Sequence, residues 1–84
     1  MTLGYEFSLV GDAARSLIAL PPRRRHKALA LIEGLAADPF MKPDLQEQGP
    51  SGRTFSILVR DDLLLSYWVD HAAKELRVLR IEFV

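Results

Sequence analysis

Apolar and polar residues alternate with a period of two on both sides of Asp61 and Asp62, within residues 52–70. This period is typical of β-strands, so we predict two strands joined by a tight turn at the aspartates. We expect the odd-numbered positions to face the core: Arg53, Phe55, Ile57 and Val59, then Leu63, Leu65, Tyr67 and Val69. The opposite face would then carry the functional residues: Thr54, Ser56, Leu58 and Arg60, then Leu64, Ser66, Trp68 and Asp70.

The residues before this hairpin indicate one strand and two helices. Alternation predicts a strand over residues 4–10, and the Asp12 carboxylate would cap a short helix over residues 13–19. Pro22 suits the first position of a second helix, where no backbone donor is required, and this helix should end near Ala36. Its apolar residues recur at spacings of three and four and form one buried face: Ala28, Leu31, Ile32 and Leu35.

The remaining segments complete the predicted fold. Residues 38–51 contain three prolines and little periodicity, so we expect an irregular connection. Residues 71–74 should form a turn before a last strand over residues 75–84, whose apolar positions change parity and therefore predict a bulge. The order is β-α-α-β-β-β, an α+β fold in which a helical hairpin covers one face of a four-stranded antiparallel sheet. We expect a single domain over residues 1–84.

Composition narrows the class of protein. Eleven basic and eleven acidic residues give a net charge of zero, so no global field attracts nucleic acid. The chain has no cysteine, which fits a reducing cytoplasm. Its first residues lack a signal-peptide pattern, and no apolar run approaches the ~20 residues that span a bilayer, so we expect a cytoplasmic protein without membrane contact. His26 and His71 have no partners at metal-ligand spacing, and no cofactor motif is present, so we expect neither a metal nor a cofactor.

Three short motifs carry a family resemblance. The sequence LAADP closes the second predicted helix at residues 35–39, FSILVR forms the first central strand at 55–60, and LLLSYWVD forms the second at 63–70. With the order of elements, these motifs resemble the RelE/ParE superfamily, the small toxins of bacterial type II toxin–antitoxin modules. The resemblance implies a growth-inhibiting toxin that a cognate antitoxin protein neutralises.

The departures from the family pattern bear on the activity. Ribosome-dependent ribonucleases of the RelE type carry basic residues where this chain has Ser56 and Leu58, and an arginine where it has Leu64. Cleavage of RNA needs an activated 2′-hydroxyl and stabilised phosphate charge. We therefore predict a ParE-like toxin that acts by binding its target, for which DNA gyrase is the family precedent. One alternative is an mRNA endoribonuclease of the RelE type, and another is an inert binding module. The weak candidates for a phosphate clamp are Arg60, Arg80 and Arg53.

Two surface features are candidates for binding. A cationic run at the start of the second helix would meet nucleic acid or a target protein, the alternative being a solvated helix face: Arg23, Arg24, Arg25 and Lys27. An apolar patch on the outer face of the hairpin would bind a protein partner, the alternative being a cover formed by residues 38–51 or by the C-terminus: Leu58, Leu64 and Trp68. Self-association into a homodimer is a further alternative.

Overall fold

The computed structural model describes residues 4–50 and 52–83, and the predictions for Ser51 and Val84 lie outside these residues. The helices and strands follow each other in this order: β1 (Glu6–Leu9), α1 (Gly11–Ala19), α2 (Pro22–Ala37), β2 (Leu45–Gln48), β3 (Thr54–Arg60), β4 (Leu63–Asp70) and β5 (Glu75–Phe83).

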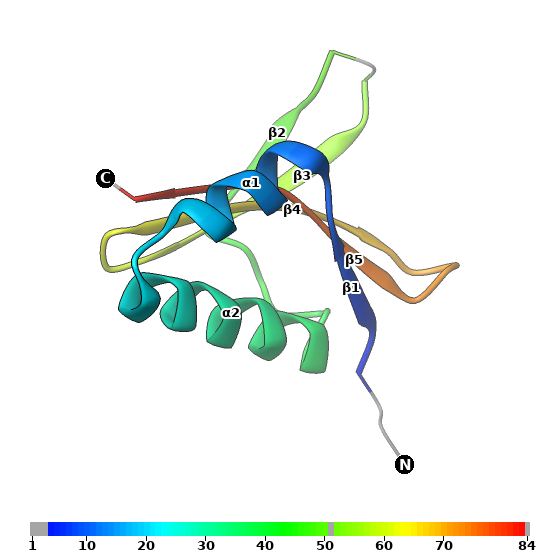
Figure 1. The fold of residues 1–84 in the computed structure, drawn as a ribbon. Coiled ribbons are helices and arrows are strands. Elements are labelled where there is room, and N and C mark those ends of the chain that lie inside the picture. Colours follow the sequence, from blue (N-terminus) through cyan, green and yellow to red (C-terminus); the bar gives the residue numbers. More distant parts are fainter. Residues whose placement is uncertain (1–3, 51, 84) are drawn as a thin grey trace.

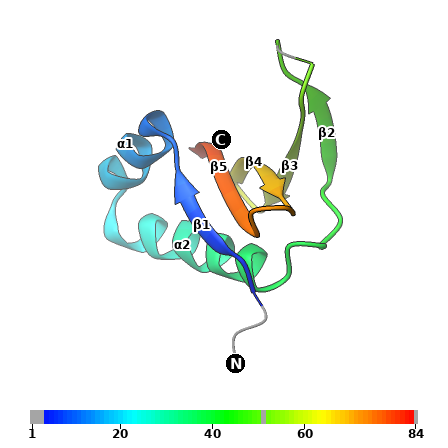
Figure 2. The ribbon, with the colours of Figure 1, turned by 90° about the vertical axis from the view of Figure 1, so that its right-hand side faces the viewer.

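The sheet has five strands in the order β1-β5-β4-β3-β2. Strand β1 runs parallel to β5, and the other neighbours are antiparallel. Both helices lie on one side of the sheet and pack mainly against β5 and β1, while the β2–β3 ribbon extends beyond them (Figures 1 and 2). The α+β class and the helical hairpin on one face are therefore confirmed. The prediction of a four-stranded, antiparallel sheet was wrong, because β2 is a fifth strand and β1 pairs with β5 in parallel. Strand β2 forms within the predicted connection. All four of its residues are exposed, so its sequence shows no apolar alternation.

The N-terminal end of α1 differs from the prediction. Helix α2 begins at Pro22 as predicted, whereas α1 begins at Gly11, two residues earlier than expected. The predicted Asp12 cap is wrong, because Val10 occupies the N-cap position and Asp12 lies in the first turn, where its carboxylate pairs with Arg15. An acidic group there still complements the helix dipole. The helices contribute small and branched side chains to the core: Ala13, Ala28, Ile32, Leu35 and Ala36.

The β3–β4 hairpin turns at Asp61 and Asp62 as predicted, but the face assigned to β3 is wrong. A two-residue turn pairs Arg60 with Leu63, and the same register pairs Leu58 with Leu65. Even positions of β3 therefore share a face with odd positions of β4. Leu58 is 0% exposed within the core, so it cannot bind a partner from the outer face. The other corrected positions are Thr54, Ser56 and Arg60, which lie on the helix side, and Arg53, Phe55, Ile57 and Val59, which lie on the opposite side.

The predicted irregularity in the last strand is confirmed as a bulge in β5. Ser66 pairs with Arg80 and Tyr67 pairs with Val78, which leaves Leu79 as the extra residue. The bulge explains the change of parity, since it keeps the apolar residues before and after Leu79 on the helix side. Four residues of β5 face the helices in this way: Leu76, Val78, Ile81 and Phe83.

Candidate functional site

The sheet face opposite the helices, called the free face below, contains a shallow groove of about 360 Å³. Cross-strand pairing positions its lining, since Val59 lies beside Leu64 and Ser66 beside Arg80. Its most buried lining residues are Ile57 and Ser66, each 6% exposed. The residues that line this free-face groove come from four strands: Glu47, Phe55, Ile57, Leu64, Ser66, Leu79, Arg80 and Glu82.

Trp68 lies on the free face beside Arg77 of the neighbouring strand and is half-buried. The Arg53 guanidinium carbon lies 4.1 Å from the centre of the Trp68 ring, a cation–π contact. The predicted outer positions of Leu64 and Trp68 therefore agree with the structure, and their binding role stays a proposal. Within the described residues 38–50, the connection does not cover the free-face groove; its strand β2 instead adds Glu47 to the lining.

The three arginines predicted as clamps do not converge. Arg80 lies in the free-face groove, where its Nε is 3.4 Å from a Glu82 carboxylate oxygen. Arg53 stacks on Trp68 of the same face. Arg60 lies on the other side of β3, where its Nη1 donates to the Asp44 carboxylate at 3.0 Å. The Val59 amide donates to the same carboxylate, and this bond, with the Arg60 charge, lowers the pKa of Asp44.

One groove residue with potential chemistry was not a candidate from the sequence. Glu47 belongs to β2, which the sequence predicted as a loop, and the structure places its carboxylate with Arg80 and Ser66 in the lining of one groove. A carboxylate can act as a general base and a guanidinium can stabilise a phosphate. The groove nevertheless has two carboxylates against one guanidinium, which disfavours a phosphate. Weak alternation in an exposed edge strand left no signal that could have indicated Glu47.

The cationic run of α2 divides into residues with separate structural contacts. Arg25 donates to the main-chain oxygens of Ile18 and Leu20 at 3.2 and 2.9 Å, which satisfies carbonyls at the end of α1. Arg24 lies 4.9 Å from the centre of the Phe83 ring. Arg23 is exposed and, within residues 4–50 and 52–83, forms no ion pair.

Lys27 joins α2 to the β3–β4 turn. Its Nζ lies 3.1 Å from Asp61 and 3.2 Å from Asp62. The hydrogen bonds that Lys27 donates to these carboxylates raise the pKa of Lys27, and the bond to Asp62 lowers the pKa of Asp62. These contacts join α2 to the sheet. Three of the four cations in the predicted nucleic-acid or target site, Arg24, Arg25 and Lys27, therefore already contact other groups of the chain.

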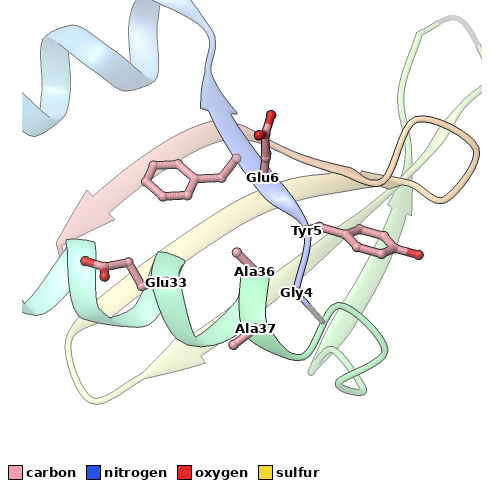
Figure 3. A pocket seen from close by; sticks show the side chains of 7 residues that line it. Gly4, Tyr5, Glu6, Glu33, Ala36 and Ala37 are labelled. Atoms are coloured by element: carbon pink, nitrogen blue, oxygen red, sulfur yellow. The ribbon is translucent and has the colours of Figure 1, made fainter. Parts of the chain in front are cut away.

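A second concave surface lies between β1 and the end of α2 (Figure 3). It encloses about 620 Å³ and is called the edge groove below. The Tyr5 amide donates to the Ala36 oxygen at 2.7 Å, and glycine at position 4 allows this approach because a Cβ there would lie 2.7 Å from the same oxygen. The lining is mostly small or apolar: Gly4, Tyr5, Glu6, Phe7, Glu33, Ala36 and Ala37.

The edge groove borders an open sheet edge. The Glu6 amide donates to the Lys74 oxygen and the Val10 amide to the Val78 oxygen, so the even-numbered residues of β1 bond to β5. Backbone groups alternate in direction along a strand, which directs those of Phe7 away from the sheet. An edge strand with free donors and acceptors can accept another strand.

Neither helix is long and apolar enough to cross a bilayer, as judged over the part of the chain that the structure describes. The same residues contain no group of three or more histidine, aspartate or glutamate side chains that could hold a metal ion.

Comparison with known proteins identifies the fold. No family model matches the chain, and no curated protein is significantly similar to it in sequence. A chain of the toxin–antitoxin complex RelBE2 from Mycobacterium tuberculosis superimposes with a TM-score of 0.78, at 19% identity, over 98% of this chain and 100% of that one. A chain of the archaeal RelE–RelB complex from Pyrococcus horikoshii gives a TM-score of 0.74, at 17% identity, over 99% and 96%. The predicted RelE-type fold is therefore confirmed.

Proposed function

We propose that this chain is the toxin of a type II toxin–antitoxin module and that it inhibits growth by binding a target protein. The RelE-type fold supports the class of protein. The observation that carries the mode of action is the free-face groove, whose lining includes four apolar side chains and whose single guanidinium is paired with a carboxylate. Such a surface suits protein contact, and DNA gyrase is the target that the ParE precedent suggests.

The electrostatics of the groove disfavour a phosphate chain. Binding of nucleic acid depends on lysine and arginine side chains that neutralise phosphates. Here Arg80 is held by Glu82 at 3.4 Å, and Glu47 adds a second negative charge to the lining. Arg60 lies on the other side of the strand and is bound to Asp44, so it cannot join Arg80 at one phosphate.

The antitoxin is the second proposed partner. The two structural neighbours were crystallised as toxin–antitoxin complexes, and we extend that arrangement to this chain. An extended antitoxin segment would pair with β1 and insert a small apolar side chain into the edge groove over Ala36 and Ala37 (Figure 3). A cytoplasmic location and self-association into a homodimer stay predictions.

A second candidate function is cleavage of ribosome-bound mRNA. The observation that favours it is the presence of Glu47 and Arg80 in one groove. In this mechanism the Glu47 carboxylate would accept the proton of the 2′-hydroxyl, and Arg80 would stabilise the negative charge on the phosphate. Arg80 would donate through its two Nη groups, since only its Nε lies beside Glu82.

Induced expression of the chain alone in a bacterial host tests these functions. We expect growth arrest, a DNA-damage response and intact mRNA, and we expect the purified chain to inhibit supercoiling by gyrase. Leu64→Ser, which removes an apolar side chain from the groove, should relieve the arrest. Ile18→Ser is the matched control, because Ile18 is 72% exposed on α1 and lies on the helix side.

The other outcomes separate the alternatives. Cleavage of translated mRNA that is lost in Glu47→Gln and in Arg80→Ala would establish the ribonuclease and refute target binding as the mode of action. Arg60→Ala serves as the control there, since Arg60 lies outside the groove. Normal growth on induction, with the folded chain present in the cells, would indicate an inert binding module.

A further inference from the structure

The charged side chains of the free face are unevenly divided between the two signs. Pairing of the strands, together with the Arg53–Trp68 contact, places five acidic and three basic residues there, counted over residues 4–50 and 52–83: Glu6, Glu47, Asp70, Glu75 and Glu82, against Arg53, Arg77 and Arg80. The chain as a whole has no net charge. The free face therefore has an excess of negative charge that the composition does not reveal.

Each of the three arginines already has a contact on this face. Arg77 Nη2 lies 3.0 Å from the Glu75 carboxylate, which also accepts a hydrogen bond from the Ser8 hydroxyl at 3.3 Å. Arg80 pairs with Glu82 at 3.4 Å, and Arg53 lies over the ring of Trp68. The positive charges of Arg77 and Arg80 are therefore offset by carboxylates of the same face.

Three of the five acidic groups form no ion pair within the described part of the chain: Glu47 on β2, Glu6 on β1 and Asp70 at the end of β4. Asp70 instead accepts a hydrogen bond from the Ala73 amide at 3.1 Å. The half-buried apolar side chains lie between β2 and β1, on the central strands around the free-face groove: Phe55, Leu64 and Leu79. The free face is thus an apolar strip with uncompensated negative charge at its margins.

We infer that the segment of a protein partner that covers the free face is amphipathic, with apolar side chains in the groove and lysine or arginine on its flanks. This inference rests on the proposed function for the existence of the partner and adds its chemistry. Like charges that face each other across an interface repel, so a partner segment with flanking carboxylates would bind more weakly. The phosphates of RNA meet the same repulsion.

Two synthetic helical peptides test the inference. Both are 15-mers with leucines at positions i, i+3, i+4 and i+7, and they differ only in having lysine or glutamate at the flanking positions. Trp68 is the chain's single tryptophan and lies on the free face, so its fluorescence reports binding there. We expect the lysine peptide to bind about tenfold more tightly at 50 mM salt, and we expect that preference to shrink at 500 mM salt.

Substitutions assign the preference to this face. Glu47→Gln and Glu82→Gln together should reduce the preference for the lysine peptide to about threefold or less while leaving the contact with leucine in place. Asp38→Asn is the matched control, because Asp38 is an exposed carboxylate at the end of α2, on the helix side. This variant should retain the tenfold preference.

Several results would overturn the inference. These are equal or tighter binding of the glutamate peptide, no response of Trp68 to either peptide up to 1 mM, or tighter binding of a single-stranded oligoribonucleotide than of the lysine peptide. Growth arrest with gyrase inhibition, combined with a preference for the glutamate peptide, would retain the proposed function and reject only this charge assignment.

Discussion

The register of the β3–β4 hairpin makes a strong prediction about two leucines. Leu58 is 0% exposed and packs in the core, whereas Leu45 on the edge strand β2 is 56% exposed on the free face. Leu58→Ala removes buried methyl groups and leaves a cavity, which costs about 3–5 kcal/mol. Leu45→Ala removes the same atoms from a solvated position and should cost about 1 kcal/mol or less.

The difference is large relative to the stability of so small a domain. At roughly 0.05–0.15 kcal/mol per residue, 84 residues have a free energy of unfolding of about 4–12 kcal/mol. Leu58→Ala should therefore remove about a quarter or more of it and lower the Tm by at least ~12 °C. Urea unfolding followed by circular dichroism measures both variants, with an unchanged m-value as the check that the unfolded state is comparable. A loss in Leu58→Ala as small as that in Leu45→Ala would refute the register, because a shift of β3 by one residue moves Leu58 from the core to the free face.

Three further predictions concern the helices and the acid range. Arg25→Ala should lower the free energy of unfolding by about 1–3 kcal/mol, because two carbonyls at the end of α1 lose their charged donor. Arg23→Ala should change it by no more than about 0.5 kcal/mol. Urea titrations of both variants measure the difference. Gly34→Ala should raise the Tm, since the added Cβ has no heavy atom within 4 Å and alanine is favoured by about 1 kcal/mol in a helix; an unchanged or lower Tm would contradict that view of α2. The lowered pKa of Asp44, caused by the Val59 amide and Arg60, stabilises the fold above the ordinary pKa of 3.8, and this stabilisation is lost as pH falls through the lower folded value. Urea unfolding between pH 2.5 and 6 should therefore show a weaker acid dependence in Asp44→Asn than in the parent chain.

The order of elements was predictable because most of the chain has a strong periodic pattern. Helix α2 has apolar residues at spacings of three and four, and the structure buries Ala28, Ile32 and Leu35 of that pattern. The bulge in β5 was also visible, since a change of parity without a turn requires an extra residue. Helix α2 and the bulge were predictable because both depend on residues close together in the sequence, and periodicity is informative only over such short separations.

The faces of β3 were harder to predict because both sides of this strand are rich in apolar residues. Leu58 and Ile57 are both buried, the first beneath the helices and the second beneath its free-face neighbours. Periodicity then cannot distinguish the sides, but turn geometry can. A two-residue turn requires Arg60 to pair with Leu63, so the predicted turn itself determined the register. Strand β2 gave no comparable signal, because an edge strand with four exposed residues needs no apolar alternation.

The corrected assignment of the two faces of β3 supports a protein target, but for a different reason from the one that the sequence suggested. The family pattern suggested missing cations at Ser56 and Leu58, yet these residues lie on the helix side, where they are irrelevant to the free face. The positions that do face outward on β3 are apolar, and the one groove cation, Arg80, is paired with Glu82. A phosphate would approach two carboxylates, Glu47 and Glu82, whereas an apolar side chain needs only to displace water from the groove. This balance supports the proposed protein target, and the effect of Leu64→Ser on the growth of induced cells would test that proposal most directly.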